Sequence, residues 1–205
     1  VPPNVAGHLE TPFAYAFGLD RARRLLAEAG YADGIDPQTG RRLTLRLALG
    51  RTDQETREST ELLAAFWDRL GIVLEAEYHN WPTFLERIGR REAPLFRVGW
   101  LADYPDAENF LQLFYSRNAS PGPNRCNYSN PAFDALYEHA LRTPDESERL
   151  ALYREMQALL RVNSPSWSSS STSSAGGISP YNTRALARGA SPIWNVVPLW
   201  PLSYW

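Results

Sequence analysis

Residues 43–101, LTLRLALGRTDQETRESTELLAAFWDRLGIVLEAEYHNWPTFLERIGRREAPLFRVGWL, determine the fold class of this 205-residue chain. Leucines at alternate positions of residues 43–49 give the two-residue period of a strand with one buried face. Residues 72–78 alternate in the same way, and residues 95–101 form a third apolar run of strand length. We therefore predict three strands in this stretch.

A helix is predicted in each interval between these strands. Thr52 and Glu55 have the spacing of a capping box, and Gly71 supplies a stop for the first helix. Its predicted buried stripe consists of Leu62, Leu63, Phe66, Trp67 and Leu70. The second helix is predicted at residues 81–91. Strands connected through helices pair in parallel with right-handed crossovers, which predicts an α/β layer structure.

The sequence on either side of this stretch is mainly helical. A short helix is predicted from a cap at Asp20 to a left-handed stop at Gly30. Further helices are predicted at residues 107–114, at 131–141 after an Asn-Pro cap, and from a capping box at 143–146 to about residue 162. The second half of the folded region should therefore be helical.

The whole chain, residues 1–205, is predicted to form a single lobe, because its length suits one compact unit. Within it we expect an irregular entry segment at 1–19 and a core at 20–163. Residues 164–179 begin with SPSWSSSSTSSAGG, a low-complexity run that predicts a loop or linker, and residues 180–205 read as an extended aromatic tail.

Composition narrows the functional classes. The net charge of -2 and the sequence pI near 6.0 predict no basic face, so nucleic acid is not an expected partner. One cysteine and three histidines without ligand spacing predict no metal site. The glycine pattern that cradles a dinucleotide phosphate is also missing after the first predicted strand, and we expect no cofactor.

A binding site is predicted beyond the carboxyl ends of the strands, where open parallel sheets bind their ligands. The loops at residues 50–52, 79–81 and 100–104 follow the three strands and should share one edge. The candidate ligand-binding residues in these loops are Arg51, Asn80, Trp81, Trp100, Asp103 and Tyr104.

Asp103 is the primary candidate, because it lies between Trp100 and Tyr104 in the sequence WLADY. A carboxylate shielded by aromatic rings can accept hydrogen bonds from a ligand's ammonium group. The alternative is that Asp103 or Asp106 only caps the helix that starts near residue 107.

The other candidates have alternative roles as well. Trp81 and Trp100 could pack in the interior of the lobe or on its surface, and Arg51 could be a solvated charge. Asp103 and Glu108 also suggest the carboxylate pair of a glycoside hydrolase, although their spacing does not require one. No serine has the glycine context of a hydrolase nucleophile, so we do not expect an enzyme.

Five separated motifs resemble the family 5 extracytoplasmic solute-binding proteins of bacteria, the peptide, dipeptide and nickel-type binders of ABC transporters. These motifs are DRARRLLAEAGYADG at 20–34, the strand-helix-strand at 43–77, VGWLADYPDAENFLQLFYS at 98–116, NYSNPAFDALYEHAL at 127–141 and RLALYREMQALL at 149–160. The resemblance implies a carboxy-terminal lobe of the type II periplasmic-binding-protein-like fold. It also implies a role in transmembrane transport, in which the protein closes over a peptide or similar small solute and delivers it to an ABC permease.

The resemblance assigns roles to individual positions too. Asp103 occupies the position that pairs with the ligand's α-amino group in similar peptide binders, with Trp100 and Tyr104 as pocket wall. It implies a periplasmic or extracytoplasmic location, associated with the membrane through the transporter. The chain departs from the family in lacking the amino-terminal lobe and in carrying the serine-rich run at 168–177, so the isolated lobe is expected to bind weakly or not at all.

Two other functions remain open at this stage. The chain could be a standalone protein-interaction domain that reuses the lobe and contacts a partner through the aromatic residues of its tail at 180–205. It could also be a glycoside hydrolase that uses Asp103 and Glu108. Loss of partner binding on removal of the tail would favour the first, and activity on chromogenic glycosides would favour the second.

Overall fold

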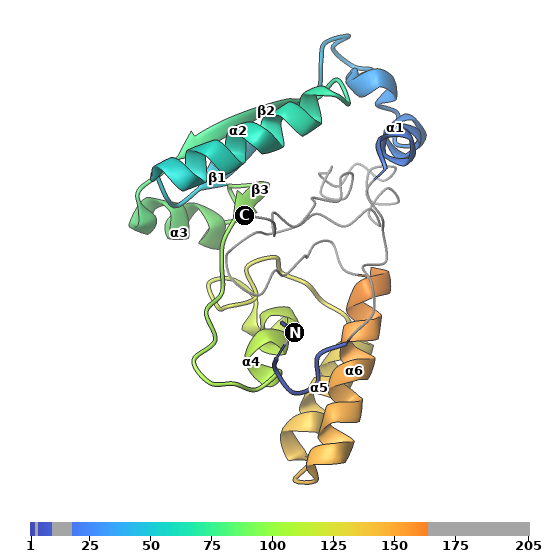
Figure 1. Cartoon of the computed structure of the whole chain (residues 1–205), viewed down its shortest axis with the longest axis vertical. Coiled ribbons are helices and arrows are strands. Elements are labelled where there is room, and N and C mark those ends of the chain that lie inside the picture. Colours follow the sequence, from blue (N-terminus) through green and yellow to red (C-terminus); the bar gives the residue numbers. More distant parts are fainter. Residues whose placement is uncertain (3, 10–17, 164–205) are drawn as a thin grey trace.

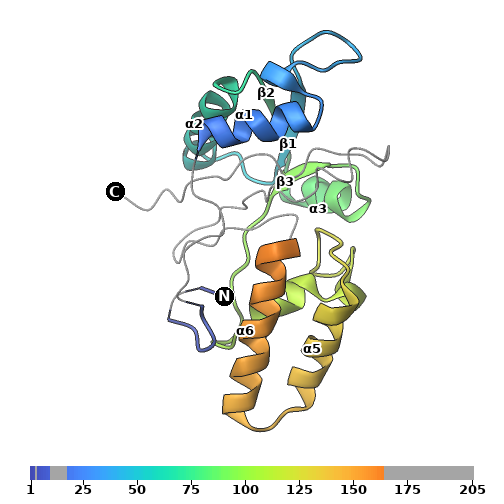
Figure 2. The same cartoon turned by 90° about the vertical axis from the view of Figure 1, so that its right-hand side faces the viewer.

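The structure is a computed structural model that describes residues 1–2, 4–9 and 18–163 (Figure 1). The loop or linker predicted at 164–179 and the tail predicted at 180–205 lie outside the described residues. Two parts are visible in Figure 1 and, after rotation, in Figure 2: a sheet with its helices, and a group of helices that follows it in the sequence. A connecting segment after the last strand joins the two parts.

The sheet has, in the part of the chain that the structure describes, three parallel strands in the order β2-β1-β3. They are β1 at Thr44–Leu49, β2 at Val73–Tyr78 and β3 at Leu95–Arg97. The parallel pairing confirms the predicted α/β layer structure. However, β3 ends four residues before the predicted boundary, and Val98 to Leu101 leave the sheet.

Helices cover both faces of this sheet because the side chains of β1 alternate. Leu47 and Leu49 join a cluster with Leu26 of α1 (Leu19–Glu28) and Trp67 of α2 (Gln54–Asp68). Ala48 faces the opposite side and packs with residues of α3 (Trp81–Gly89). A short 3-10 turn, η1 at Ala32–Gly34, links α1 to the sheet.

Two predicted helix starts are wrong by one or two residues. The cap of α2 is Asp53, whose side chain accepts a hydrogen bond from the Thr56 backbone N–H, and not Thr52. The cap of α1 is Gly18, and Asp20 lies inside the first turn. In both cases the helix begins one or two residues away from the predicted cap. Residue spacing alone does not locate a helix end that accurately.

The buried stripe of α2 also differs from the prediction. Leu62 is 41% exposed, whereas Thr56 and Thr60 are buried in line with Trp67. The polar threonines tolerate burial because the Thr60 hydroxyl donates to the Thr56 carbonyl at 2.6 Å. The stripe therefore includes two residues that a purely apolar pattern leaves out.

The helical part contains α4 (Glu108–Leu111), α5 (Pro131–Arg142) and α6 (Glu146–Asn163), with 3-10 turns η2 (Gln112–Phe114) and η3 (Ser116–Asn118). The predicted Asn-Pro cap of α5 is confirmed, since Asn130 accepts hydrogen bonds from the N–H groups of Ala132 and Phe133. The cap before α6 is Asp145. None of the helices in residues 18–163 has the length and hydropathy that a membrane span requires.

The helical part has a hydrophobic core of its own. Phe133 and Tyr137 of α5 pack against Tyr153 and Met156 of α6, and the Ala107 side chain before α4 is buried among them. The start of the chain is attached here, because the Gln157 side-chain amide donates to the Gly7 carbonyl at 2.7 Å. The two parts of the fold therefore rest on different cores, and the segment between β3 and α4 joins them.

Candidate functional site

The loops after β1 and β2 meet at one edge of the sheet. A Cβ atom on Gly50 would lie 2.8 Å from Cε3 of Trp81 and 2.6 Å from Cδ1 of Phe84. Only glycine permits this close approach of α3 to the end of β1. The prediction that these two loops share an edge is confirmed.

Asn80 and Trp81 have structural roles at this edge. Asn80 caps α3 by accepting a hydrogen bond from the Thr83 N–H at 3.0 Å. The Trp81 ring lies 5.5 Å from the Phe84 ring between centroids, yet 49% of the residue remains exposed. Trp81 therefore packs on one side and offers apolar surface on the other.

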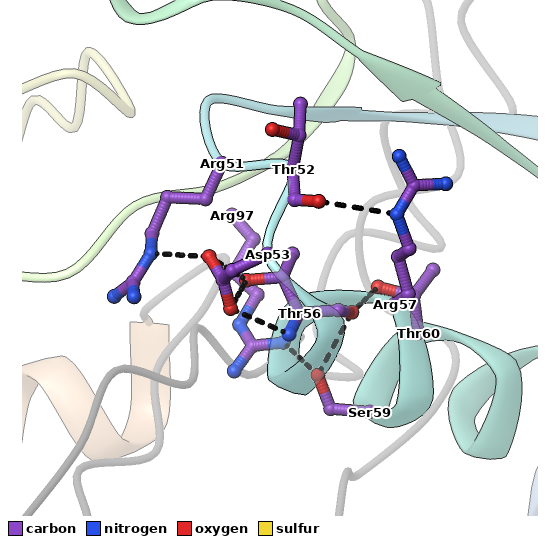
Figure 3. A network of polar contacts seen from close by, with 8 residues as sticks. All are labelled: Arg51, Thr52, Asp53, Thr56, Arg57, Ser59, Thr60 and Arg97. Carbon is purple, nitrogen blue, oxygen red and sulfur yellow. Dashed lines mark hydrogen bonds and ion pairs between the residues drawn. The ribbon is translucent and has the colours of Figure 1, made fainter.

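The loop after β1 contains a network of polar contacts (Figure 3). Arg51 donates from Nε to Asp53 at 2.8 Å, and Asp53 also accepts from the backbone and hydroxyl groups of Thr56. Arg97, the last residue of β3, donates to the Ser59 hydroxyl of α2 at 2.7 Å. Arg51 is consequently an ion-paired residue and not only a solvated charge, while the Arg97 contact ties the end of β3 to α2.

Arg97 is a residue of this edge that the sequence analysis missed. It is half-buried, and burial lowers the pKa of its guanidinium, while the nearby Glu55 opposes that shift. A cationic residue at the carboxyl end of a parallel strand could have indicated it. Arg97 was not recognised as a strand-end residue because the predicted strand continued through residue 101.

Asp53 makes the stability of this edge dependent on pH. The hydrogen bond from the Thr56 N–H is the main cause that lowers the pKa of Asp53 from 3.8 to about 2. A carboxyl group whose pKa is depressed by folding contributes stability above its unfolded pKa, and this contribution disappears as the pH falls through the folded value. Asp53 should therefore stabilise α2 fully above about pH 4 and progressively less down to about pH 2.

We expect Asp53→Asn to reduce the acid sensitivity of unfolding. Urea titrations at about pH 5 and about pH 2.5 should show a smaller loss of unfolding free energy in this variant than in the unaltered chain. Asp20→Asn is the matched control, because Asp20 lies in the first turn of α1 and is not its cap. An equal pH dependence in the Asp53 variant and the unaltered chain would contradict the prediction.

The third predicted loop leaves the sheet edge. The chain after β3 descends to the helical part in both views (Figures 1 and 2). There Trp100 donates from Nε1 to the side chain of Asn109 at 2.7 Å, and the Tyr104 hydroxyl donates to the carboxylate of Glu108. The expectation that residues 100–104 share the edge with Arg51 and Trp81 is therefore corrected, because α4 holds this segment through side-chain hydrogen bonds.

Asp103 is exposed, and no hydrogen bond or ion pair joins it to another residue in the described ranges. Neither aspartate is the cap of α4, because its N-cap is Ala107 and has no side-chain cap. The Asp106 side chain does accept a hydrogen bond from the Glu108 N–H, at 2.8 Å. Trp100 and Tyr104 on either side are partly exposed, and Leu101 is almost fully so. The segment thus presents a single carboxylate among apolar side chains.

Glu108, the first residue of α4, connects this segment to α5. One carboxylate oxygen accepts from Tyr104 and the other from Tyr137 of α5. Burial, followed by the bond to Glu108, raises the pKa of Tyr137. From the sequence, Glu108 was a candidate only as the acid of a hydrolase, because spacing does not reveal its tyrosine partners.

Comparison with known proteins identifies the family. Residues 1–122 match the family described as "Bacterial extracellular solute-binding proteins, family 5 Middle". The chain belongs to this family. The resemblance predicted from the five sequence motifs is thereby confirmed.

Curated relatives of this chain include proteins that are named as peptide-binding. The periplasmic oligopeptide-binding protein OppA of Escherichia coli is 28% identical over 145 residues, which are 71% of this chain and 25% of the relative. The heme-binding protein A of Haemophilus influenzae is 25% identical over 165 residues, or 80% of this chain and 29% of the relative. The chain thus spans less than one third of these relatives.

Solved structures confirm the predicted fold class, an α/β lobe of the type II periplasmic-binding-protein kind. The peptide-bound DppA of Helicobacter pylori matches with a TM-score of 0.67 and 28% identity, over 78% of this chain and 30% of that chain. A dipeptide-binding protein of Pseudoalteromonas in complex with Met-Leu matches with a TM-score of 0.64 and 26% identity, over 78% and 31% respectively. This chain therefore has the fold of a part of these binding proteins, about 30% of their length.

Proposed function

We propose that this chain is a ligand-binding lobe of an extracytoplasmic protein that captures peptides for an ABC importer. The carboxylate of Asp103, which is exposed between Trp100 and Tyr104 and pairs with no other described residue, is the observation that carries the proposal. The names of the curated relatives, which include oligopeptide-binding and dipeptide-binding proteins, support peptides as the solute class. The remaining lobe and the membrane permease would be its partners.

Asp103 suits the amino end of a peptide. An ammonium group donates three hydrogen bonds and pairs with a carboxylate more strongly than a neutral donor does. A second lobe that closes over the segment would exclude water and increase the strength of this pair. The partly exposed faces of Trp100 and Tyr104 would then contact the adjacent backbone or side chain of the ligand.

We also infer that the chain is not an enzyme. The Asp106 carboxylate accepts a hydrogen bond from the Glu108 N–H, and both oxygens of Glu108 accept hydrogen bonds from tyrosines. These contacts leave Asp103 without a second free carboxylate beside it in the segment, which argues against the general acid and base of a glycoside hydrolase. A panel of chromogenic glycosides tests this inference directly.

Calorimetric titration of the full-length protein tests the binding function. We expect a short peptide with a free amino terminus to bind, and the same peptide after amino-terminal acetylation to bind at least about 30-fold more weakly. Haemin is the contrasting ligand, because one relative is named as a heme-binding protein. Haemin binding without peptide binding, or equal affinity for both forms of the peptide, would contradict the proposal.

A further inference from the structure

The segment that carries Asp103 is held in place from the helical part of the fold. We call residues 100–106 the recognition segment. Its first side chain, Trp100, donates to Asn109, which is completely buried, and its last, Asp106, accepts from the backbone at the start of α4. Both ends of the segment are therefore fixed to a packed core.

The centre of the recognition segment is anchored by the Tyr104 side chain. Tyr104, next to Asp103, is 45% exposed, and its hydroxyl donates to Glu108. The second oxygen of Glu108 accepts from Tyr137, which is only 4% exposed and stacks on Tyr115 at 4.6 Å between ring centroids. Through Glu108, an exposed ring is thus connected to a buried ring that cannot move freely.

We propose that Glu108 is a positioning residue for ligand binding: it fixes Tyr104, and with it the adjacent Asp103 carboxylate, in the geometry that receives a ligand's amino group. This inference rests on the proposed function of the chain. Without the Glu108 bond, Tyr104 and the backbone at Asp103 would sample more conformations before binding. Ordering them on binding costs entropy, which reduces affinity without removing any direct ligand contact.

A carboxylate suits this position because it accepts two hydroxyl donors at once and donates none. The bond to Glu108 is also the main cause that raises the pKa of Tyr104. The phenol therefore stays protonated, and it remains a donor to Glu108 across the whole physiological pH range.

The test compares the dissociation constant of a free-amine peptide in variants of the full-length protein. We expect Tyr104→Phe and Glu108→Ala each to weaken binding by about 3- to 10-fold, in line with the ordering of one or two side chains. The double variant should bind no more weakly than Glu108→Ala alone, because both changes remove the same contact. Glu108→Gln keeps an acceptor oxygen for one tyrosine and should restore part of the affinity.

Tyr115→Phe is the matched control. Its hydroxyl donates to Glu138 at 2.7 Å, so this variant also removes a tyrosine-carboxylate bond from the helical part. Phenylalanine keeps the ring that stacks on Tyr137, so the chain of contacts from Tyr137 through Glu108 to Tyr104 is retained. The variant should leave peptide affinity unchanged, even where the melting temperature falls. Nuclear magnetic resonance of labelled tyrosine should in addition show a lower pKa for Tyr104 in Glu108→Ala.

The outcomes distinguish the positioning role of Glu108 from the peptide-binding function itself. If the unaltered protein binds free-amine peptides and Tyr104→Phe and Glu108→Ala bind them equally well, the positioning role is overturned and the binding function stands. Losses that add in the double variant, or that Tyr115→Phe reproduces, would indicate a general structural effect and would also overturn it. An unaltered protein that binds no peptide would overturn both the binding function and the positioning role.

Discussion

Replacing Asp103 with alanine is expected to weaken the binding of free-amine peptides by about 30-fold to several thousand-fold, which corresponds to roughly 2 to 5 kcal/mol. The effect should be large because closure of a second lobe would leave the ligand's ammonium group desolvated without a counter-charge. Amino-acetylated peptides lack this charge, so their weaker binding should change little. Calorimetric titration of both peptides into both proteins gives the four dissociation constants.

Two further variants separate charge from shape at this position. Asp103→Asn keeps the size of the side chain and removes the charge, and it should lose most of the preference for a free amine. Asp106→Asn is the matched control, since it removes an acid from the same segment and retains an oxygen that can accept from the Glu108 N–H. Equal losses for free and acetylated peptides in the Asp103 variants would contradict the assigned role.

Gly71→Ala is expected to destabilise the fold by more than about 3 kcal/mol, one of the largest effects available to a single methyl group. Gly71 follows α2 with a φ of +79°, and a Cβ there would lie 2.1 Å from the carbonyl oxygen of Asp33. The two turns pack backbone against backbone, because a Cβ on Gly34 would likewise lie 2.5 Å from the Leu70 carbonyl oxygen. Neither turn can yield without displacing α2 or η1.

Gly40→Ala is the control for the backbone angle. Gly40 also has a positive φ, of +65°, but a Cβ there would have no neighbour within 4 Å. The free energy of unfolding of this variant should therefore fall only by the cost of a left-handed alanine, about 1 to 2 kcal/mol. Urea unfolding of the three proteins measures the difference between Gly71→Ala and Gly40→Ala. A difference near zero would show that the close contact of the two turns does not contribute to stability.

The sheet and its helices could be predicted because their signals are local. Alternating leucines in β1 and the Asn-Pro pair before α5 act within a few residues, and both predictions are confirmed. Helix caps were less accurate. Thr52 and Asp53 are adjacent residues of the kind that caps helices, and the backbone conformation decides between them.

The boundary of β3 shows where a local signal is misleading. Residues 98–101 are apolar enough to continue a strand, yet the chain turns away after Arg97. The reason is a contact nine residues along the chain, from Trp100 to Asn109. A period of two cannot reveal that a side chain is retained by a different part of the fold.

The sequence by itself therefore determined the parallel α/β sheet, the helical second half, the family and Asp103 as the primary candidate, because periodicity and motifs are properties of neighbouring residues. Only the tertiary structure decided that Ala107 is the N-cap of α4, that residues 100–104 leave the edge occupied by Arg51 and Trp81, and that Glu108 bonds to Tyr137, 29 residues away. Such contacts depend on how separate elements pack against one another. No spacing within one element specifies that packing.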